Sequence, residues 1–273
     1  DTHQRGVSTL CFNNKGDILA SVGMDADSTL AFHAWDKNVM LLKTPTGFGK
    51  VYCLCFMDRD IYTDKNGSPM IEKEFNCKAG SGAASFDASN AYTDVAITGG
   101  EKHLKFWWIS NGKNIKTQRG LWNNEDSNTN ILCVASETPN VCVTGDSNGR
   151  VLLWENFKCV YNTARGYETL GRVTVSTTAG TEGTVSAVTP LLGEITYPHG
   201  KSPIQAICAV KGTIPVLFDI NNDLTQHAVT DAPKYITADN NGIIAFWILI
   251  RNANATNTTN GDALELKCVR TVD

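Results

Sequence analysis

Short strands of alternating apolar and polar residues recur along the chain, and four of them follow the same layout. Each copy opens with small polar residues, turns at Asp, Asn or Gly, and continues as an apolar strand that ends in Trp or, once, in His33. The copies are SVGMDADSTLAFH (21–33), TGGEKHLKFW (98–107), TGDSNGRVLLW (144–154) and TADNNGIIAFW (237–247). This period of two predicts half-buried β-strands, and helical periodicity is almost absent.

Further strands flank each copy. A strand with a Cys-containing core precedes it, and the four versions are VSTLCF (7–12), VYCLCF (51–56), NILCV (130–134) and IQAICAV (204–210). A more polar strand follows it, as in FKCVYNT (157–163) and LELKCVRTV (264–272). Four short antiparallel strands per ~40–45 residues, with a Trp ending the third, are typical of the blade of a β-propeller.

The spacing of the copies predicts the domain organisation. We expect an all-β chain of four blades, at approximately 3–45, 46–120, 121–165 and 199–273. Polar segments rich in Gly, Ser and Thr, at approximately 58–93, 163–200 and 251–263, are predicted to be insertions between strands. The abrupt start at Asp1 and the long insertions indicate part of a larger or tandem propeller, because closed rings have ~4–8 blades.

Composition narrows the function classes. The 273 residues are 42% hydrophobic and 19% charged, with a formal net charge of −4, which disfavours a general nucleic-acid binder or a polybasic membrane surface. The longest apolar run, IIAFWILI (243–250), has the length of a strand, so no membrane span is predicted.

Nine cysteines could indicate disulfides or a metal site. Cys11, Cys55, Cys133 and Cys208 occupy the same position of their repeats on short apolar strands, and no CxxC pair occurs. A small apolar residue repeated at one strand position predicts a core position, since unpaired Cys packs as a small hydrophobe. We therefore expect reduced thiols without a metal, in a cytosolic setting.

Three stretches carry a family resemblance. HQRGVSTLCFNNKGDILASVGMDADSTLAFHAWD (3–36), KHLKFWWISNGKNIKTQRGLW (102–122) and VTGDSNGRVLLWENFKCV (143–160) resemble, in order, successive blades of the echinoderm microtubule-associated protein-like family of WD-repeat propellers. The resemblance implies a structural protein of the cytoplasm and cytoskeleton, including the cilium and its axoneme, with tubulin, microtubules or other axonemal proteins as partners. A generic WD-repeat scaffold for a signalling or trafficking complex is the alternative.

Catalysis is not expected. The sets His3, Ser21, Asp25 and His199, Thr237, Asp239 contain the residue types of a hydrolase site, yet their recurrence in two blades favours buried hydrogen-bond networks. GFGK (47–50) lacks the spacing of a phosphate-binding loop. No catalytic residue, cofactor, metal or small-molecule substrate is predicted.

One segment is a candidate partner-binding site. Between Lys102 and Arg119 the chain carries five basic residues and no acid, and we predict that they contact the acidic surface of tubulin. Ordinary solvated surface charge is the alternative interpretation. The candidate residues are Lys102, Lys105, Lys113, Lys116 and Arg119.

Overall fold

The computed structural model describes residues 2–47, 49–57, 94–110, 114–122, 128–136, 141–163, 198–210, 234–252 and 263–272. Four antiparallel sheets, each of four strands in chain order, make up this part of the chain. We call these sheets blades 1 to 4. A single 3-10 turn, Trp35–Lys37, interrupts the strands of blade 1.

The first two blades take the N-terminal part of the chain. Blade 1 consists of β1 (Val7–Phe12), β2 (Ile18–Gly23), β3 (Leu30–Ala34) and β4 (Val39–Thr44). Blade 2 consists of β5 (Val51–Phe56), β6 (Asp94–Gly100), β7 (His103–Ser110) and β8 (Asn114–Arg119).

The other two blades follow in the same way. Blade 3 consists of β9 (Ile131–Ala135), β10 (Val141–Asp146), β11 (Val151–Glu155) and β12 (Lys158–Asn162). Blade 4 consists of β13 (Ile204–Ala209), β14 (Tyr235–Asp239), β15 (Ile244–Asn252) and β16 (Ala263–Val272).

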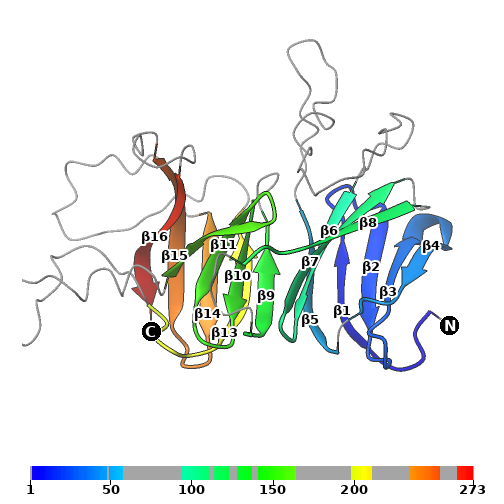
Figure 1. The fold of residues 1–273 in the computed structure, drawn as a ribbon, viewed down its shortest axis with the longest axis horizontal. Helices are drawn as coiled ribbons and strands as arrows, with labels where there is room; N and C mark the ends of the chain where they lie inside the picture. Colours follow the sequence, from blue (N-terminus) through cyan, green and yellow to red (C-terminus); the bar gives the residue numbers. More distant parts are fainter. Residues whose placement is uncertain are drawn as a thin grey trace, which may run out of the picture.

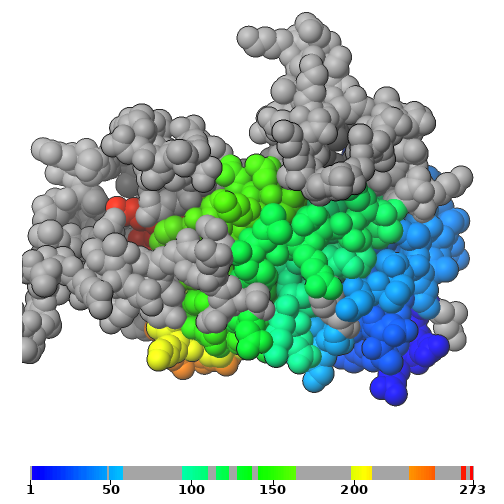
Figure 2. Space-filling model, in the orientation of Figure 1, coloured from blue at the N-terminus to red at the C-terminus, as the bar shows by residue number. Residues whose placement is uncertain are grey.

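The blades stand side by side in chain order, from the N-terminus to the C-terminus (Figure 1). The first strand of each blade contacts the first strand of the next, so β1 lies against β5, β5 against β9 and β9 against β13. In the space-filling view the same order runs from blade 1 to blade 4 along the row (Figure 2). The predicted all-β propeller architecture is confirmed, with four strands in every blade.

Three hydrophobic clusters hold the row together, one at each junction of neighbouring blades. Strand alternation divides each blade into a leading face, which meets the preceding blade, and a trailing face, which meets the following blade. The third-strand Trp lies on the leading face. Accordingly, Trp107 packs on blade 1, Trp154 on blade 2 and Trp247 on blade 3, and each is at most 1% exposed.

The same alternation explains the aromatic run of β7. Trp107 belongs to the cluster shared with blade 1, whereas Phe106 and Trp108 belong to the cluster shared with blade 3. Phe157 of blade 3 packs edge-on against both rings, with centroids 5.0 Å from Phe106 and 4.8 Å from Trp108. Phe106, Trp107 and Trp108 are therefore all buried between blades. A buried ring of this size contributes several kcal/mol to the stability of the fold, at ~25 cal/mol/Å².

Tight turns between the second and third strands follow the sequence signals. Gly149 and Gly242 have φ values of 78° and 89°, which a side chain would strain. In blade 3 a Cβ at Gly149 would also lie 2.5 Å from the carbonyl oxygen of Gly200. This turn is therefore closely packed against the entry to blade 4.

Candidate partner-binding surface

A hydrogen-bond chain runs through blade 4 from its third-strand Trp to a carboxylate. The indole Nε1 of Trp247 donates to Thr237 Oγ1 over 2.8 Å, and His199 Nε2 lies 2.6 Å from the same oxygen. His199 Nδ1 lies 3.1 Å from Asp239 Oδ2. A neutral imidazole that carries its proton on Nδ1 satisfies every group, because it accepts from the Thr hydroxyl and donates to the carboxylate.

Blade 1 contains a looser version of the same chain. His3 Nε2 lies 2.8 Å from Ser21 Oγ, while its Nδ1 is 3.9 Å from the Asp25 carboxylate. His33 occupies the position of the Trp, paired across the strands with Leu19. The interpretation as a hydrogen-bond network within a blade is confirmed for His199, Thr237 and Asp239. In blade 1 His3 bonds Ser21, whereas Asp25 accepts from Thr29 and not from the ring.

Blade 3 uses an arginine that sequence reasoning missed. Trp154 Nε1 donates to Thr144 Oγ1 over 2.9 Å, as in blade 4. No His among the described residues reaches Asp146; instead Arg150 Nε donates to its Oδ2 over 2.6 Å and Thr129 Oγ1 donates to the same oxygen over 3.1 Å. The signal in the sequence was an Asp at the network position with an Arg four residues later.

Burial decides the ionisation of these groups. It lowers the pKa of His199, although the Asp239 carboxylate acts in the opposite direction. It likewise lowers the pKa of His3, and that of His103 in blade 2 to about 4. The three imidazoles are therefore neutral at pH 7. The hydrogen bonds of His3 and His199 reach the second strand of their blades, whereas His103 Nδ1 lies 3.4 Å from the carbonyl oxygen of Glu101 in the turn before β7.

The core position predicted for the repeated cysteines is confirmed for Cys133 and is wrong for Cys208. Cys133 is buried at 7% exposure and burial raises the pKa of its thiol to about 12. Cys208, by contrast, is exposed, because it lies on the trailing face of blade 4, where the described residues include no following blade. Among the described residues no three His, Cys, Asp or Glu side chains gather as metal ligands.

The four cysteines are also not equivalent in register. Cys55 pairs across the ladder with Ile97, as Cys11 does with Ala20 and Cys208 with Ile236. Cys133 pairs with Gly145, and its structural counterpart is Cys53, which pairs with Gly99. The mistake arose because positions two apart on a strand share a face, so either can hold a small core residue.

The predicted basic site is partly assembled by the structure. Lys105 and Arg119 are cross-strand neighbours on β7 and β8, and exposed Lys102 lies in the turn that leads into β7. Lys116 is exposed on β8, but alternation directs it to the opposite face of the sheet from Arg119. Lys113 lies outside the described residues.

Lys105 has a structural role of its own. Its Nζ donates to the carbonyl oxygen of Thr46 over 3.1 Å and lies 3.9 Å from the centre of a Trp107 ring. Burial, and secondarily the charge of Arg119, lower its pKa. Lys105 thus ties blade 2 to the segment leaving blade 1, and the exposed basic residues around it are Lys102, Lys116 and Arg119.

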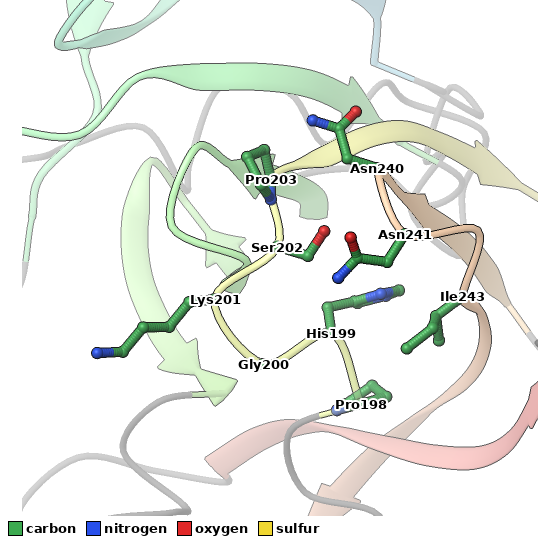
Figure 3. A pocket seen from close by; sticks show the side chains of 9 residues that line it. All are labelled: Pro198, His199, Gly200, Lys201, Ser202, Pro203, Asn240, Asn241 and Ile243. Carbon is green, nitrogen blue, oxygen red and sulfur yellow. The ribbon is translucent and has the colours of Figure 1, made fainter.

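A shallow open pocket of about 680 Å³ lies where the chain enters blade 4. His199 projects between Asn241 and Ile243, and Lys201 extends away from the other labelled side chains (Figure 3). Ser202 Oγ is buried and makes no hydrogen bond. The polar atoms at this opening provide hydrogen-bonding groups beside the exposed Lys201.

Four serial antiparallel sheets, three of which bury a third-strand Trp on a Thr hydroxyl, define the class of fold: these are blades of a β-propeller. No helix in the described residues is long and apolar enough to cross a membrane.

Comparisons with known proteins give partial sequence matches to two kinds of curated protein. No protein-family profile matches the chain. It is 32% identical over 62 residues to Echinoderm microtubule-associated protein-like 1 of Mus musculus and of Homo sapiens, which is 23% of this chain and 8% of theirs. It is 26% identical over 155 residues to Cilia- and flagella-associated protein 44 of Trypanosoma brucei brucei, which is 55% of this chain and 7% of that protein. The chain therefore matches less than a tenth of the length of either relative.

Two solved structures share a loose likeness. The computationally designed Ika4 protein superposes with a TM-score of 0.43 at 13% identity, covering 91% of this chain and 97% of its own. The β-propeller domain of Myceliophteria thermophila Cps50 (Swd1) superposes with a TM-score of 0.48 at 8% identity, covering 96% and 59%. The fold assignment rests on the sheets and their register.

Proposed function

We propose that this chain is a microtubule-associated structural propeller, which binds the tubulin lattice or axonemal proteins through the outer side of blade 2. The observation that carries the proposal is the sequence similarity to a microtubule-associated and to a cilia- and flagella-associated protein. The corresponding location is the cytoplasm and cytoskeleton, including the cilium. A catalytic role is not proposed, since the buried His, Thr and Asp groups join strands.

The exposed basic residues of blade 2 supply the physical contact. The chain as a whole carries a net charge of −4, so a general attraction to an acidic filament is not expected. The three exposed cations nevertheless form a positive region that spans both faces of the edge strand β8, with Lys116 on one face, Arg119 on the other and Lys102 in the turn before β7. No acid lies between residues 102 and 119. Such a region attracts the acidic tails of tubulin at distances below the Debye length of ~8 Å.

Co-sedimentation with microtubules at physiological salt tests the proposal. The wild-type chain is expected in the pellet. The affinity of the triple variant Lys102→Glu, Lys116→Glu, Arg119→Glu for microtubules should be lower by a factor of roughly ten or more, since three exposed charges change sign. Lys105 is left in place because it contacts Thr46 and Trp107.

The matched control reverses three exposed lysines away from blade 2, Lys15, Lys37 and Lys201, and so changes the total charge by the same amount. Equal loss in both triple variants would indicate net charge rather than a site on blade 2. A wild-type chain that stays in the supernatant would favour the alternative function, a WD-repeat scaffold for a signalling or trafficking complex.

A further inference from the structure

A serine at the entry to blade 4 carries a hydroxyl without a hydrogen-bond partner in the described part of the chain. Ser202 is 8% exposed, and its Oγ is buried. A buried hydroxyl in this state raises the free energy of the fold, so native structures usually pair it. Ser202 lines the shallow pocket between the entry segment of blade 4 and the turn that joins β14 to β15, and its Oγ points toward the middle of that pocket, beside Asn241 (Figure 3). The pocket lies beyond the ends of the strands, not on a sheet face.

Blade 3 contains the same position with a different residue, Thr129. Thr129 and Ser202 each lie two residues before the Ile that begins the first strand of their blade. In both blades the carbonyl oxygen of the next residue accepts from the turn between the second and third strands. The donor is the backbone amide of Ser147 over 3.0 Å in blade 3 and that of Asn240 over 3.1 Å in blade 4. The two hydroxyls are therefore carried by the same backbone arrangement, and their partners can be compared directly.

The hydroxyl of Thr129 is satisfied by a carboxylate of its own blade, since it donates to Asp146 Oδ2 over 3.1 Å. In blade 4 the equivalent carboxylate serves other donors. Asp239 Oδ2 pairs with His199 over 3.1 Å, and Oδ1 accepts from two backbone amides of the turn over 2.9 and 3.0 Å. Ser202 therefore lacks the acceptor that its counterpart has. A carboxylate from another molecule would supply an oxygen of the same kind.

The charge and shape of the pocket suit an acidic side chain. The described residues that line it include one permanently charged side chain, Lys201, and no acid. Lys201 is exposed and extends away from the other lining side chains, so it adds positive potential rather than a hydrogen bond (Figure 3). Amide donors come from exposed Asn240 and Asn241, and apolar walls from Pro198 and Ile243. Because a small-molecule site encloses most of its ligand, a shallow pocket fits a side chain that projects from a protein surface better.

We propose that this pocket binds a glutamate or aspartate side chain of a partner protein, with Ser202 Oγ donating a hydrogen bond to the carboxylate. Asn241 is exposed, so its side chain can rotate to open access to the buried oxygen and donate a second hydrogen bond. Hydrogen bonds to a carboxylate are shorter and stronger than those between neutral groups. The pocket is separate from the basic residues of blade 2, and the proposal does not rest on microtubule binding.

An NMR titration of the isotope-labelled full chain tests the proposal. The probes are the capped peptide Ala-Ala-Glu-Ala-Ala and the same peptide with Gln in place of Glu. The Glu peptide should shift the backbone amide signals of Lys201, Ser202, Asn240 and Asn241, and the Gln peptide should bind roughly fivefold more weakly or worse, because it offers no charged acceptor. Ser202→Ala should reduce the affinity for the Glu peptide to that of the Gln peptide. Ser202→Thr should retain it, since Thr129 bonds a carboxylate from the same position.

Melting temperatures separate binding from a structural role of the hydroxyl. Ser202→Ala removes an unpaired group and should leave the melting temperature unchanged or higher. The matched control Thr129→Val removes a paired hydroxyl and should lower it, with an unchanged affinity for the Glu peptide.

Four results would each overturn the proposal: no shift at the pocket, equal binding of the two peptides, full binding by Ser202→Ala, or acetate or inorganic phosphate that binds there as tightly as the Glu peptide. The last result would indicate a site for small anions. No microtubules are present, so failure here and failure of co-sedimentation are distinguishable.

Discussion

Blades 3 and 4 each bury a third-strand Trp on an equivalent Thr hydroxyl, yet different groups satisfy the neighbouring carboxylate. Blade 4 uses His199, whose neutral ring connects Thr237 to Asp239. Blade 3 uses the permanently charged Arg150, which binds Asp146, four residues earlier in the same turn. In these two blades the Trp and its Thr acceptor are the same, whereas the group that satisfies the carboxylate differs.

The largest effect is expected from removing the buried third-strand Trp of blade 3, a feature that blades 3 and 4 share. Trp154→Ala should lower the free energy of unfolding by roughly 3–5 kcal/mol, because a fully buried ring at the junction with blade 2 is replaced by a cavity. Urea denaturation at low protein concentration measures the loss. The control Trp35→Ala, at 53% exposure, should cost about 1 kcal/mol or less. Equal losses would contradict the packing described for the junction.

The next effect concerns the arginine of blade 3. Arg150→Met should destabilise the chain by about 2–3 kcal/mol, since the buried Asp146 loses its counter-charge but keeps hydrogen bonds from Thr129 and two backbone amides. The double variant Arg150→Met, Asp146→Asn removes both charges and should recover part of the loss. A single variant as stable as the wild type would show that the ion pair is dispensable.

The smallest expected effect is a pH dependence of stability that distinguishes the histidine of blade 4 from the arginine of blade 3. The folded pKa of His199 lies below the ordinary value of 6.5, so above pH 6.5 the ring is neutral in both states and stability is complete. As the pH falls below 6.5, the unfolded chain binds the proton first and stability decreases, by at most about 1.4 kcal/mol per pH unit for each such histidine. His103 acts in the same direction down to its folded pKa of about 4.

Melting temperatures between pH 7 and pH 5 should show this decrease in the wild type. His199→Gln keeps a hydrogen-bonding group that does not titrate, and should give a shallower decrease. Arg150→Met should be less stable at every pH but should keep the wild-type slope, because a guanidinium does not titrate in this range. A slope unaffected by His199→Gln would assign the pH dependence to other groups.

The sequence was sufficient for the strands and for most of the network residues. Alternation placed Trp107, Trp154 and Trp247 on third strands. The recurrence of His with Ser or Thr and Asp identified the network of blade 4 and the His3–Ser21 hydrogen bond of blade 1. These features are local, since each blade is one continuous stretch of chain. Local patterns are what period and spacing report.

Contacts between blades could not be obtained in this way. The sequence did not show that Cys208 would be exposed, because its burial depends on whether another sheet covers that face. It did not separate Lys116 from Arg119, since the face of each side chain depends on the register of β8 against β7. Arg150 was missed because a surface cation and a buried one look identical in sequence.

The connection between the first and second strands has a consequence for how such a protein can change over time. It comprises residues 13–17 in blade 1 and 136–140 in blade 3, but 57–93 in blade 2 and 210–234 in blade 4. In all four blades the flanking strands still pair in an antiparallel ladder. Loop-closure entropy rises only slowly with length, so this hairpin is a site where tens of residues can be gained or lost during evolution while every ladder stays in register.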